Sequence, residues 1–133
     1  MINKDIIRLA SNTSNVGLKN KYSHKISLKN STCGDKITLE LIADKKKISS
    51  MKYETISCVY CEASASLLSR KIKNVKLKDI KNDFIILKKI SLKKKIKIPK
   101  RLSDFKKLLN SDNFNRFKCI FLPIDAVLKA LKL

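Results

Sequence analysis

The sequence lacks the features of a membrane or secreted protein. Its 133 residues contain no run of about eighteen uncharged apolar residues, which is the length that a membrane-spanning helix requires. The N-terminal residues MINKDIIRLASN lack the apolar core of a signal peptide. We therefore expect a cytoplasmic protein that has no membrane partner. A chain of this length suits a single domain, 1–133, with one hydrophobic core.

Arginine and aromatic residues are also scarce, which argues against a nucleic acid partner. The formal net charge is +20 at pH 7, but the arginines are limited to Arg8, Arg70, Arg101 and Arg116. Arginine is the residue preferred for bidentate contacts with phosphates and bases, and aromatic residues, here only 6%, supply stacking platforms. The abundant lysine is typical of an AT-biased genome, so we interpret it as a solvated surface that suits acidic protein partners.

The periodicity of the first half predicts a short helix followed by a sheet. Residues 3–10 suit a helix, and residues 11–17 suit a turn that ends at Gly17. Strand character follows over residues 21–29, 36–43 and 48–56. Because ADKKK between the last two strands is typical of a hairpin connection, these segments predict a small three-stranded antiparallel sheet.

The second half has the periodicity of helices. The small residues of ASAS would let a helix that starts near Ala63 lie close against the sheet. Pro123 is typical of a first helical position, so the last helix is predicted to begin just after Cys119. A sheet followed by several helices predicts the α+β class. Between these two helices we expect a helix over 75–90, a helix or strand over 91–98 and a helix over 101–110.

Three of the four cysteines lie at predicted element boundaries. Cys33 precedes the second strand, Cys58 opens the first main helix, and Cys119 precedes the last helix. A sheet packed on those helices can bring the three together, as a tetrahedral metal site requires. Unpaired N–H groups at a helix N-terminus favour the thiolate form, so Cys58 and Cys119 are candidate ligands or nucleophiles. The alternative is that a buried free cysteine serves only as a small apolar side chain.

Two further residues lie next to these cysteines. Gly34 lets the backbone turn tightly, so Cys33 and Asp35 can point to the same side, where a carboxylate can ligate zinc or hold a neighbouring ligand. Cys61 follows Cys58 with CxxC spacing, but no second pair completes a zinc knuckle. A thioredoxin-type redox pair would follow the first strand of a βαβ unit, whereas this pair follows an antiparallel sheet.

Four segments together carry a resemblance to a known family. The sequence resembles the iron–sulfur assembly proteins of the IscU/NifU N-terminal family in the order and spacing of these segments, over nearly the whole chain. Lys118 stands where the IscU branch has a histidine, and RFKC is similar to the R-x-K-C of the SufU-like branch. The segments are NTSNVG (12–17), NSTCGDKITLEL (30–41), SCVYCEASASLL (57–68) and RFKCIFLPIDAVLKAL (116–131).

The resemblance implies a zinc site and a role in sulfur transfer. Cys33 matches the persulfide acceptor of SufU-like proteins, and Cys119 matches the acceptor favoured in the IscU branch. The partners implied are a SufS-like cysteine desulfurase and SUF-type cluster assembly proteins. On this interpretation the chain is a sulfur carrier that serves the desulfurase and is not a stand-alone enzyme. The zinc ligands implied by the resemblance are Cys33, Asp35, Cys58 and Cys119.

Some positions add to the family pattern or depart from it. Arg116 matches a family arginine, which the resemblance implies could pair with a carboxylate or thiolate near the site; the alternative is a solvated arginine. Ser57 replaces a glycine and Thr13 replaces a proline, which changes the backbone freedom of two loops. Cys61 replaces a small residue, so it could supply an extra thiolate or receive sulfur itself.

Two other functions remain open from the residues. Thiolate sites bind iron as well as zinc, so the same cysteines could form a scaffold that assembles a [2Fe–2S] cluster. The alternative from another class is a basic zinc-binding nucleic-acid module, for which the net charge is the main argument.

Overall fold

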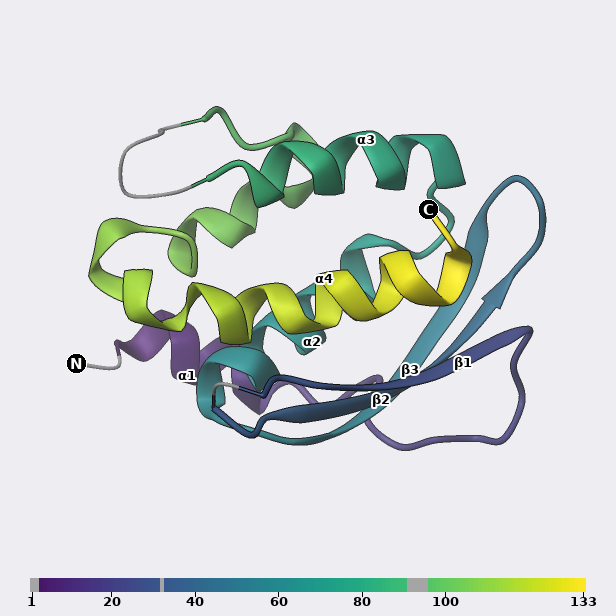
Figure 1. Ribbon diagram of the computed structural model, residues 1–133, viewed down its shortest axis with the longest axis horizontal. Coiled ribbons are helices and arrows are strands. Elements are labelled where there is room, and N and C mark those ends of the chain that lie inside the picture. Colours follow the sequence, from purple (N-terminus) through teal and green to yellow (C-terminus); the bar gives the residue numbers. More distant parts are fainter. Residues whose placement is uncertain (1–2, 32, 91–95) are drawn as a thin grey trace.

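The protein is built from a three-stranded antiparallel sheet with helices packed on one face (Figure 1). The computed structural model describes residues 3–31, 33–90 and 96–133. The strands are β1 (His24–Lys29), β2 (Lys36–Ala43) and β3 (Ile48–Ile56). The α-helices are α1 (Lys4–Ser11), α2 (Val59–Lys71), α3 (Leu77–Lys88) and α4 (Phe117–Leu131), and the 3-10 helices are η1 (Lys100–Lys107) and η2 (Ser111–Arg116).

The sheet has the strand order β1-β2-β3, with β2 in the centre. Alternate residues of β2, Ile37, Leu39 and Leu41, are fully buried beneath the helices, as the alternating sequence predicts. In register, Leu39 lies between Ile26 of β1 and Tyr53 of β3. The predicted strands 36–43 and 48–56 match β2 and β3, and the predicted α+β class is confirmed. The first predicted strand, 21–29, begins later, at His24.

The opposite face of β2 carries a buried carboxylate, that of Glu40. Its Oε1 accepts hydrogen bonds from the backbone N–H groups of Lys19 and Asn20, at 2.8 and 3.0 Å. The Nζ of Lys25 lies 3.6 Å from the other carboxylate oxygen. Glu40 therefore attaches the segment after Gly17 to the outer face of the sheet, which explains why a charged residue is buried there.

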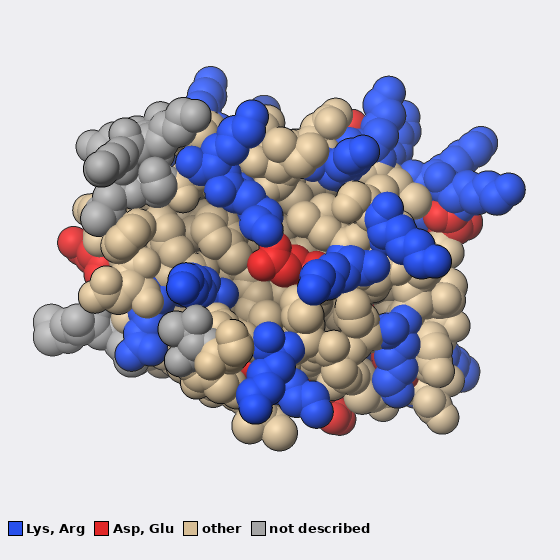
Figure 2. Space-filling model, in the orientation of Figure 1, with Lys and Arg blue, Asp and Glu red and all other residues tan. Residues whose placement is uncertain are grey.

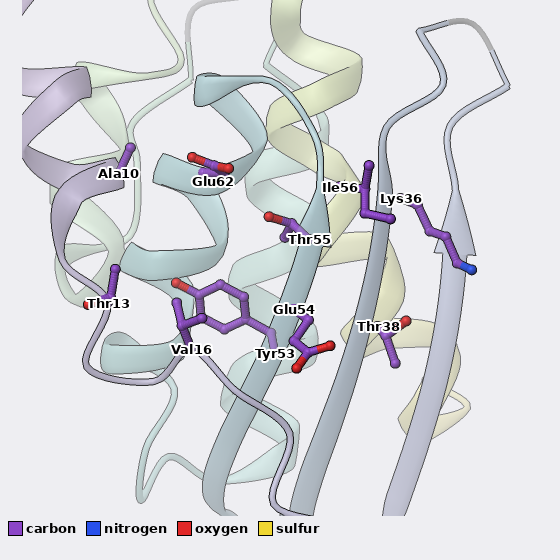
Figure 3. A pocket seen from close by; sticks show the side chains of 10 residues that line it. All are labelled: Ala10, Thr13, Val16, Lys36, Thr38, Tyr53, Glu54, Thr55, Ile56 and Glu62. Carbon is purple, nitrogen blue, oxygen red and sulfur yellow. The ribbon is translucent and has the colours of Figure 1, made fainter.

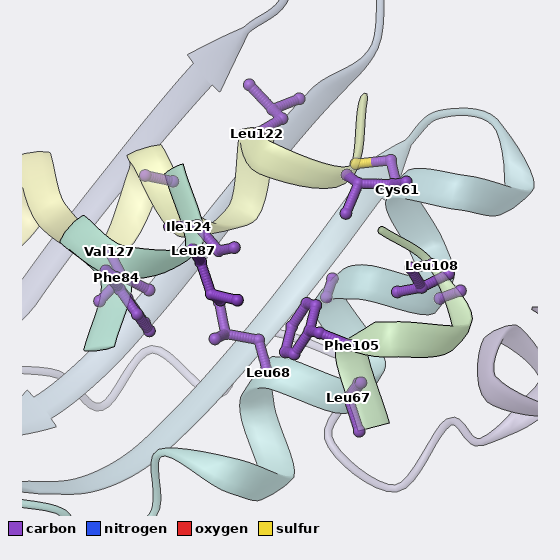
Figure 4. Packing of buried hydrophobic residues seen from close by; sticks show 14 of the residues in the cluster. Cys61, Leu67, Leu68, Phe84, Leu87, Phe105, Leu108, Leu122, Ile124 and Val127 are labelled. Carbon is purple, nitrogen blue, oxygen red and sulfur yellow. The ribbon is translucent and has the colours of Figure 1, made fainter. Parts of the chain in front are cut away.

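Helix α2 lies at the centre of the helical layer, and its ASAS run is buried on every side. The Oγ of Ser64 donates a 2.6 Å hydrogen bond to the carbonyl of Ile120 in α4. The Oγ of Ser66 donates to the carbonyl of Asn12 at 2.9 Å, so it holds the N-terminal turn. Small side chains allow this close approach, and Figure 4 shows residues of α2, α3, η1 and α4 meeting in one core.

The last helix differs from the prediction. It begins at Phe117, so Cys119 lies in its first turn and Pro123 lies inside it, whereas the sequence predicts a start after Cys119 with Pro123 as the first residue. The missing N–H of Pro123 removes a helical hydrogen bond, a cost that burial of its side chain in the core offsets. The 3-10 helix η2 runs directly into α4 and starts the helix earlier.

The other predicted helices are found with different boundaries. α2 starts at Val59, four residues before the predicted start, and the helix predicted over 75–90 corresponds to α3. The helix predicted over 101–110 is the 3-10 helix η1. Of the segment 91–98, residues 91–95 lie outside the described residues, and 96–98 are neither helix nor strand. Among the described residues, no helix is both long and apolar enough to cross a membrane.

Candidate metal centre

Three segments that are far apart in the sequence meet at one end of the sheet. The β1–β2 loop brings Cys33 and Asp35, the N-terminus of α2 brings Cys58, and the first turn of α4 brings Cys119. The sulfur atoms of Cys33 and Cys119 and a carboxylate oxygen of Asp35 all lie within 4.8 Å of one another. The two sulfur atoms are 3.3 Å apart, although the residues are 86 positions apart.

The β1–β2 loop positions its two donors through Gly34. Gly34 adopts a φ of +77°, in the left-handed region that favours glycine, and its N–H donates to the carbonyl of Asn30 at 2.8 Å. The N–H of Asn30 in turn donates to the carbonyl of Asp35 at 2.7 Å. This tight loop turns Cys33 and Asp35 to the same side, as the sequence predicts.

Cys58 is the N-cap residue of α2 and is hydrogen-bonded to Asp35. Its backbone N–H donates to Oδ1 of Asp35 at 3.1 Å, and its Sγ donates to Oδ2 at 3.2 Å. The carboxylate therefore connects the β1–β2 loop to α2 and places the thiol of Cys58 beside the other donors. The four residues that the resemblance implies as ligands are thus neighbours in the fold.

The carboxyl of Asp35 is stabilised in its ionised form. Burial by itself would raise the pKa of Asp35, but hydrogen bonds from Cys58, Cys119 and Cys33 outweigh this and lower the pKa below its usual value. A buried carboxylate that accepts hydrogen bonds from thiols provides the negative charge that a divalent cation requires.

In the protein without a bound cation, burial opposes the thiolate form that the sequence predicts for Cys58 and Cys119. Burial, followed by the hydrogen bond to Asp35, raises the pKa of Cys58, although backbone N–H groups at the helix N-terminus act in the opposite direction. Burial and the neighbouring Cys33 and Asp35 raise the pKa of Cys119 further. The increase in pKa from burial thus exceeds the decrease from the helix N-terminus. A bound cation would lower the pKa of both thiols, because it binds the deprotonated form.

Cys61 lies in the hydrophobic core and not at the metal centre. Its side chain is fully buried and belongs to the cluster of apolar residues drawn in Figure 4. Burial raises the pKa of its thiol to about 12, against a hydrogen bond to Ser57 that lowers it. The structure therefore favours the alternative that Cys61 is a small apolar side chain.

Arg116 has a different partner from the one implied by the resemblance. Its guanidinium lies over the ring of Tyr60, 5.7 Å from the ring centroid, in a cation–π contact. The ion pairs found between described residues do not include Arg116. No sequence pattern predicts the role of Tyr60, because the contact depends on how η2 and α2 pack.

A groove of about 520 Å³ lies beside this site, between the strands and the helices α1 and α2 (Figure 3). Tyr53 of β3 and Glu62 of α2 line it, together with Lys36 and Ile56. Ile56 is 77% exposed although it is apolar, and it lies two residues before Cys58. The sequence pattern did not predict this groove, because it depends on how the N-terminal turn lies along the edge of β3.

Comparison with known proteins identifies the family. Residues 1–112 match the family described as "NifU-like N terminal domain". The chain belongs to this family. The match confirms the family predicted from the sequence, an iron–sulfur cluster assembly family. The matched range of this NifU-like domain includes Cys33, Asp35 and Cys58 but ends before Cys119, so the inclusion of Cys119 rests on the resemblance of residues 116–131 and on the geometry.

Solved structures share the fold of this NifU-like domain. The N-terminal part of a NifU-like protein from Brucella abortus has a TM-score of 0.89 at 18% identity, covering 98% of this chain and 91% of that chain. A protein from Fervidobacterium islandicum AW-1, named as an iron–sulfur cluster assembly scaffold for the SUF system, has a TM-score of 0.85 at 20% identity, covering 98% and 96%. No protein with curated functional information matches the sequence.

Proposed function

We propose that this NifU-like domain accepts persulfide sulfur from a SufS-like cysteine desulfurase on Cys33, at a zinc site, and passes it to SUF-type cluster assembly proteins. The observation that carries the proposal is the convergence of the Cys33 and Cys119 sulfurs with the Asp35 carboxylate within 4.8 Å, in a chain of this family. The reaction suits a reducing compartment such as the cytoplasm, because the acceptor must stay a thiol.

The donor set fits zinc. Cys33, Asp35, Cys58 and Cys119 would hold the ion, since zinc is bound in proteins by thiolates, imidazoles and carboxylates in tetrahedral sites. When bound, zinc keeps its cysteine ligands deprotonated at neutral pH. Asp35 is a harder ligand than a thiolate, and this makes its bond the most exchangeable of the four.

The exposure of the thiols supports Cys33 as the acceptor. Cys33 is exposed, whereas Cys119 is buried and Cys58 is half-buried, so Cys33 is the sulfur that a docked partner reaches most directly. The thiolate of Cys33 attacks the terminal sulfur of the desulfurase persulfide. A new S–S bond forms on Cys33 while the S–S bond of the desulfurase breaks, and the desulfurase cysteine leaves as a thiolate. Cys119, 3.3 Å away, is the alternative acceptor.

A scaffold for a [2Fe–2S] cluster is the second candidate. The name of the Fervidobacterium neighbour favours it, and the same thiols and carboxylate can ligate iron. Metal and sulfide analysis of protein purified without oxygen separates the two candidates. Zinc without sulfide supports the proposal, whereas iron with acid-labile sulfide supports the scaffold and contradicts the zinc site.

The sulfur-transfer step is tested by desulfurase turnover. Alanine release from cysteine by a SufS-like desulfurase is measured with the wild type, Cys33→Ala and Cys119→Ala. Ser103→Ala is the control, because Ser103 is exposed on η1, which carries none of the proposed site residues. We expect stimulation and a labelled persulfide with the wild type and the control, and neither with Cys33→Ala. If Cys33→Ala and Cys119→Ala both keep stimulating turnover, the mechanism is wrong.

A further inference from the structure

A second groove, of about 530 Å³, runs between β1 and α4 and borders the loop that carries Cys33. Lys29 of β1, Lys88 of α3 and both Lys118 and Lys129 of α4 lie around it, and all four side chains are exposed. The lysines come from three elements that are distant in the sequence, so the fold itself gathers these charges. On this face of the molecule, basic side chains surround a hollow over α4 and acidic ones are few (Figure 2).

Most of this positive charge is not neutralised within the protein. Among the described lining residues, Asp125 is the acidic one, and it is already bonded to Lys88. The ion pairs between described residues include none that involves Lys29, Lys118 or Lys129. The groove therefore presents three cations to a ligand, close enough to one another to line the same cavity.

The floor of the groove is apolar. Leu28 of β1 and Phe121 and Leu128 of α4 line it and are half-buried, so each keeps apolar surface open to the groove. Covering such surface with an apolar side chain of a partner is favourable, because it removes apolar area from water. A nucleic acid backbone would leave this floor unused, and the groove contains no arginine among its described lining residues for bidentate phosphate contacts.

An apolar floor with a cationic rim is complementary to an acidic, amphipathic protein segment. We propose that the groove between β1 and α4 binds such a segment of a partner protein, with carboxylates at Lys29, Lys118 and Lys129 and a leucine or phenylalanine side chain on the floor. Ser31 lies two residues before Cys33, and Lys118 directly precedes Cys119. A segment held there would sit beside the cysteine site, which is where a partner in the proposed sulfur transfer must dock.

The proposal is tested by binding of a labelled peptide to the whole domain. The probe is an eight-residue peptide that alternates glutamate with leucine and phenylalanine, measured by fluorescence anisotropy. The double variant Lys29→Glu/Lys129→Glu reverses the charge at two positions that line the groove. Lys45→Glu/Lys46→Glu is the control, because it makes the same charge change at exposed positions of the β2–β3 hairpin. We expect the groove variant to bind at least about tenfold more weakly and the control to change affinity less than about twofold.

Three outcomes would overturn the proposal. One is an equal loss of peptide affinity in the groove variant and the control variant, because this would show that the peptide is attracted by the net charge of the protein and not by the groove. Another is unchanged binding when glutamine replaces glutamate in the peptide. The third is a duplex DNA that binds more tightly than the peptide and loses affinity in the groove variant. Cys33→Ala should keep peptide binding while it abolishes sulfur transfer, so failure of this proposal is distinguishable from failure of the proposed function.

Discussion

At the scale of single residues, the β1–β2 loop shows how backbone conformation prepares a chemical site. Gly34 turns the chain with a positive φ, and Asp35 then accepts hydrogen bonds from both the backbone and the thiol of Cys58. One carboxylate thus connects two cysteine-bearing segments. The loop conformation and this carboxylate together determine where the donors lie.

Substitution of Gly34 tests the backbone argument. A Cβ at this position would have no heavy atom within 4 Å, so the cost of a side chain is conformational and not steric crowding. We expect Gly34→Ala to lower the free energy of unfolding by about 1 kcal/mol, and Gly34→Asn by less, because asparagine adopts the left-handed region more readily. Urea unfolding measures this. Equal stability of the three proteins would contradict the argument.

The raised pKa values of Cys58 and Cys119 predict proton release on zinc binding. A thiol whose pKa lies above its ordinary value is protonated at pH 7, whereas the metal binds the thiolate. We therefore expect about two protons to leave these residues at pH 7, and the apparent affinity to rise as the pH rises.

Calorimetry in two buffers of different ionisation enthalpy measures this proton release. Cys58→Ser should release about one proton fewer than the wild type. An affinity that does not change between about pH 6 and pH 8 would contradict the prediction.

The sequence predicts much of the arrangement of the site residues, and the predictions that are wrong have physical causes. The turn at Gly34 and the grouping of Cys33 with Asp35 follow from short-range rules. The sequence predicts that the helix N-terminus lowers the pKa of Cys119. Burial raises this pKa instead, and burial depends on the folded structure, which local patterns do not reveal. The burial of Cys61 and the contact of Arg116 with Tyr60 depend on packing between elements, which local patterns do not encode.

At the scale of elements, helix α2 organises the helical layer. Its buried serines are satisfied by carbonyls of α4 and the N-terminal turn, so polar side chains here connect elements. The sequence predicted the close approach of this helix from its small residues. It did not predict the start of α4, because Pro123 is normally a signal for the first helical turn and here is buried inside the helix.

Ser64→Ala tests the connection between α2 and α4. The substitution removes the buried hydrogen bond to the Ile120 carbonyl and leaves a small gap, so we expect the free energy of unfolding to fall by about 1 kcal/mol. Ser27→Ala is the control, because the Ser27 hydroxyl bonds Thr38 at the exposed face of the sheet. The control should lose less than about 0.5 kcal/mol. Equal losses in urea unfolding would contradict a special role for Ser64.

At the scale of the whole molecule, the net charge of +20 is the dominant electrostatic property. The described residues contain few ion pairs, and all but two of these, Lys25–Glu40 and Arg101–Asp83, have both partners at least 34% exposed. Self-repulsion among lysines therefore opposes folding, while the same charge draws acidic partners toward the protein.

Salt should relieve this repulsion. We expect the urea midpoint of unfolding to increase when sodium chloride rises from about 0.05 M to about 0.5 M, by an amount on the order of 1 kcal/mol in stability, because screening weakens like-charge repulsion. Lys45→Glu/Lys46→Glu lowers the net charge and should reduce the response to salt. A midpoint that falls as salt increases would contradict the prediction.

The separation of 86 positions between Cys33 and Cys119 also determines when the donor set is complete. A ribosome synthesises Cys33, Asp35 and Cys58 well before it synthesises α4, so the nascent chain carries an incomplete set of donors until α4 is made. Three donors without the fourth hold a cation less firmly, since each added ligand contributes to affinity. Stable retention of metal would thus begin only after α4 has been synthesised and has packed against α2 and the sheet.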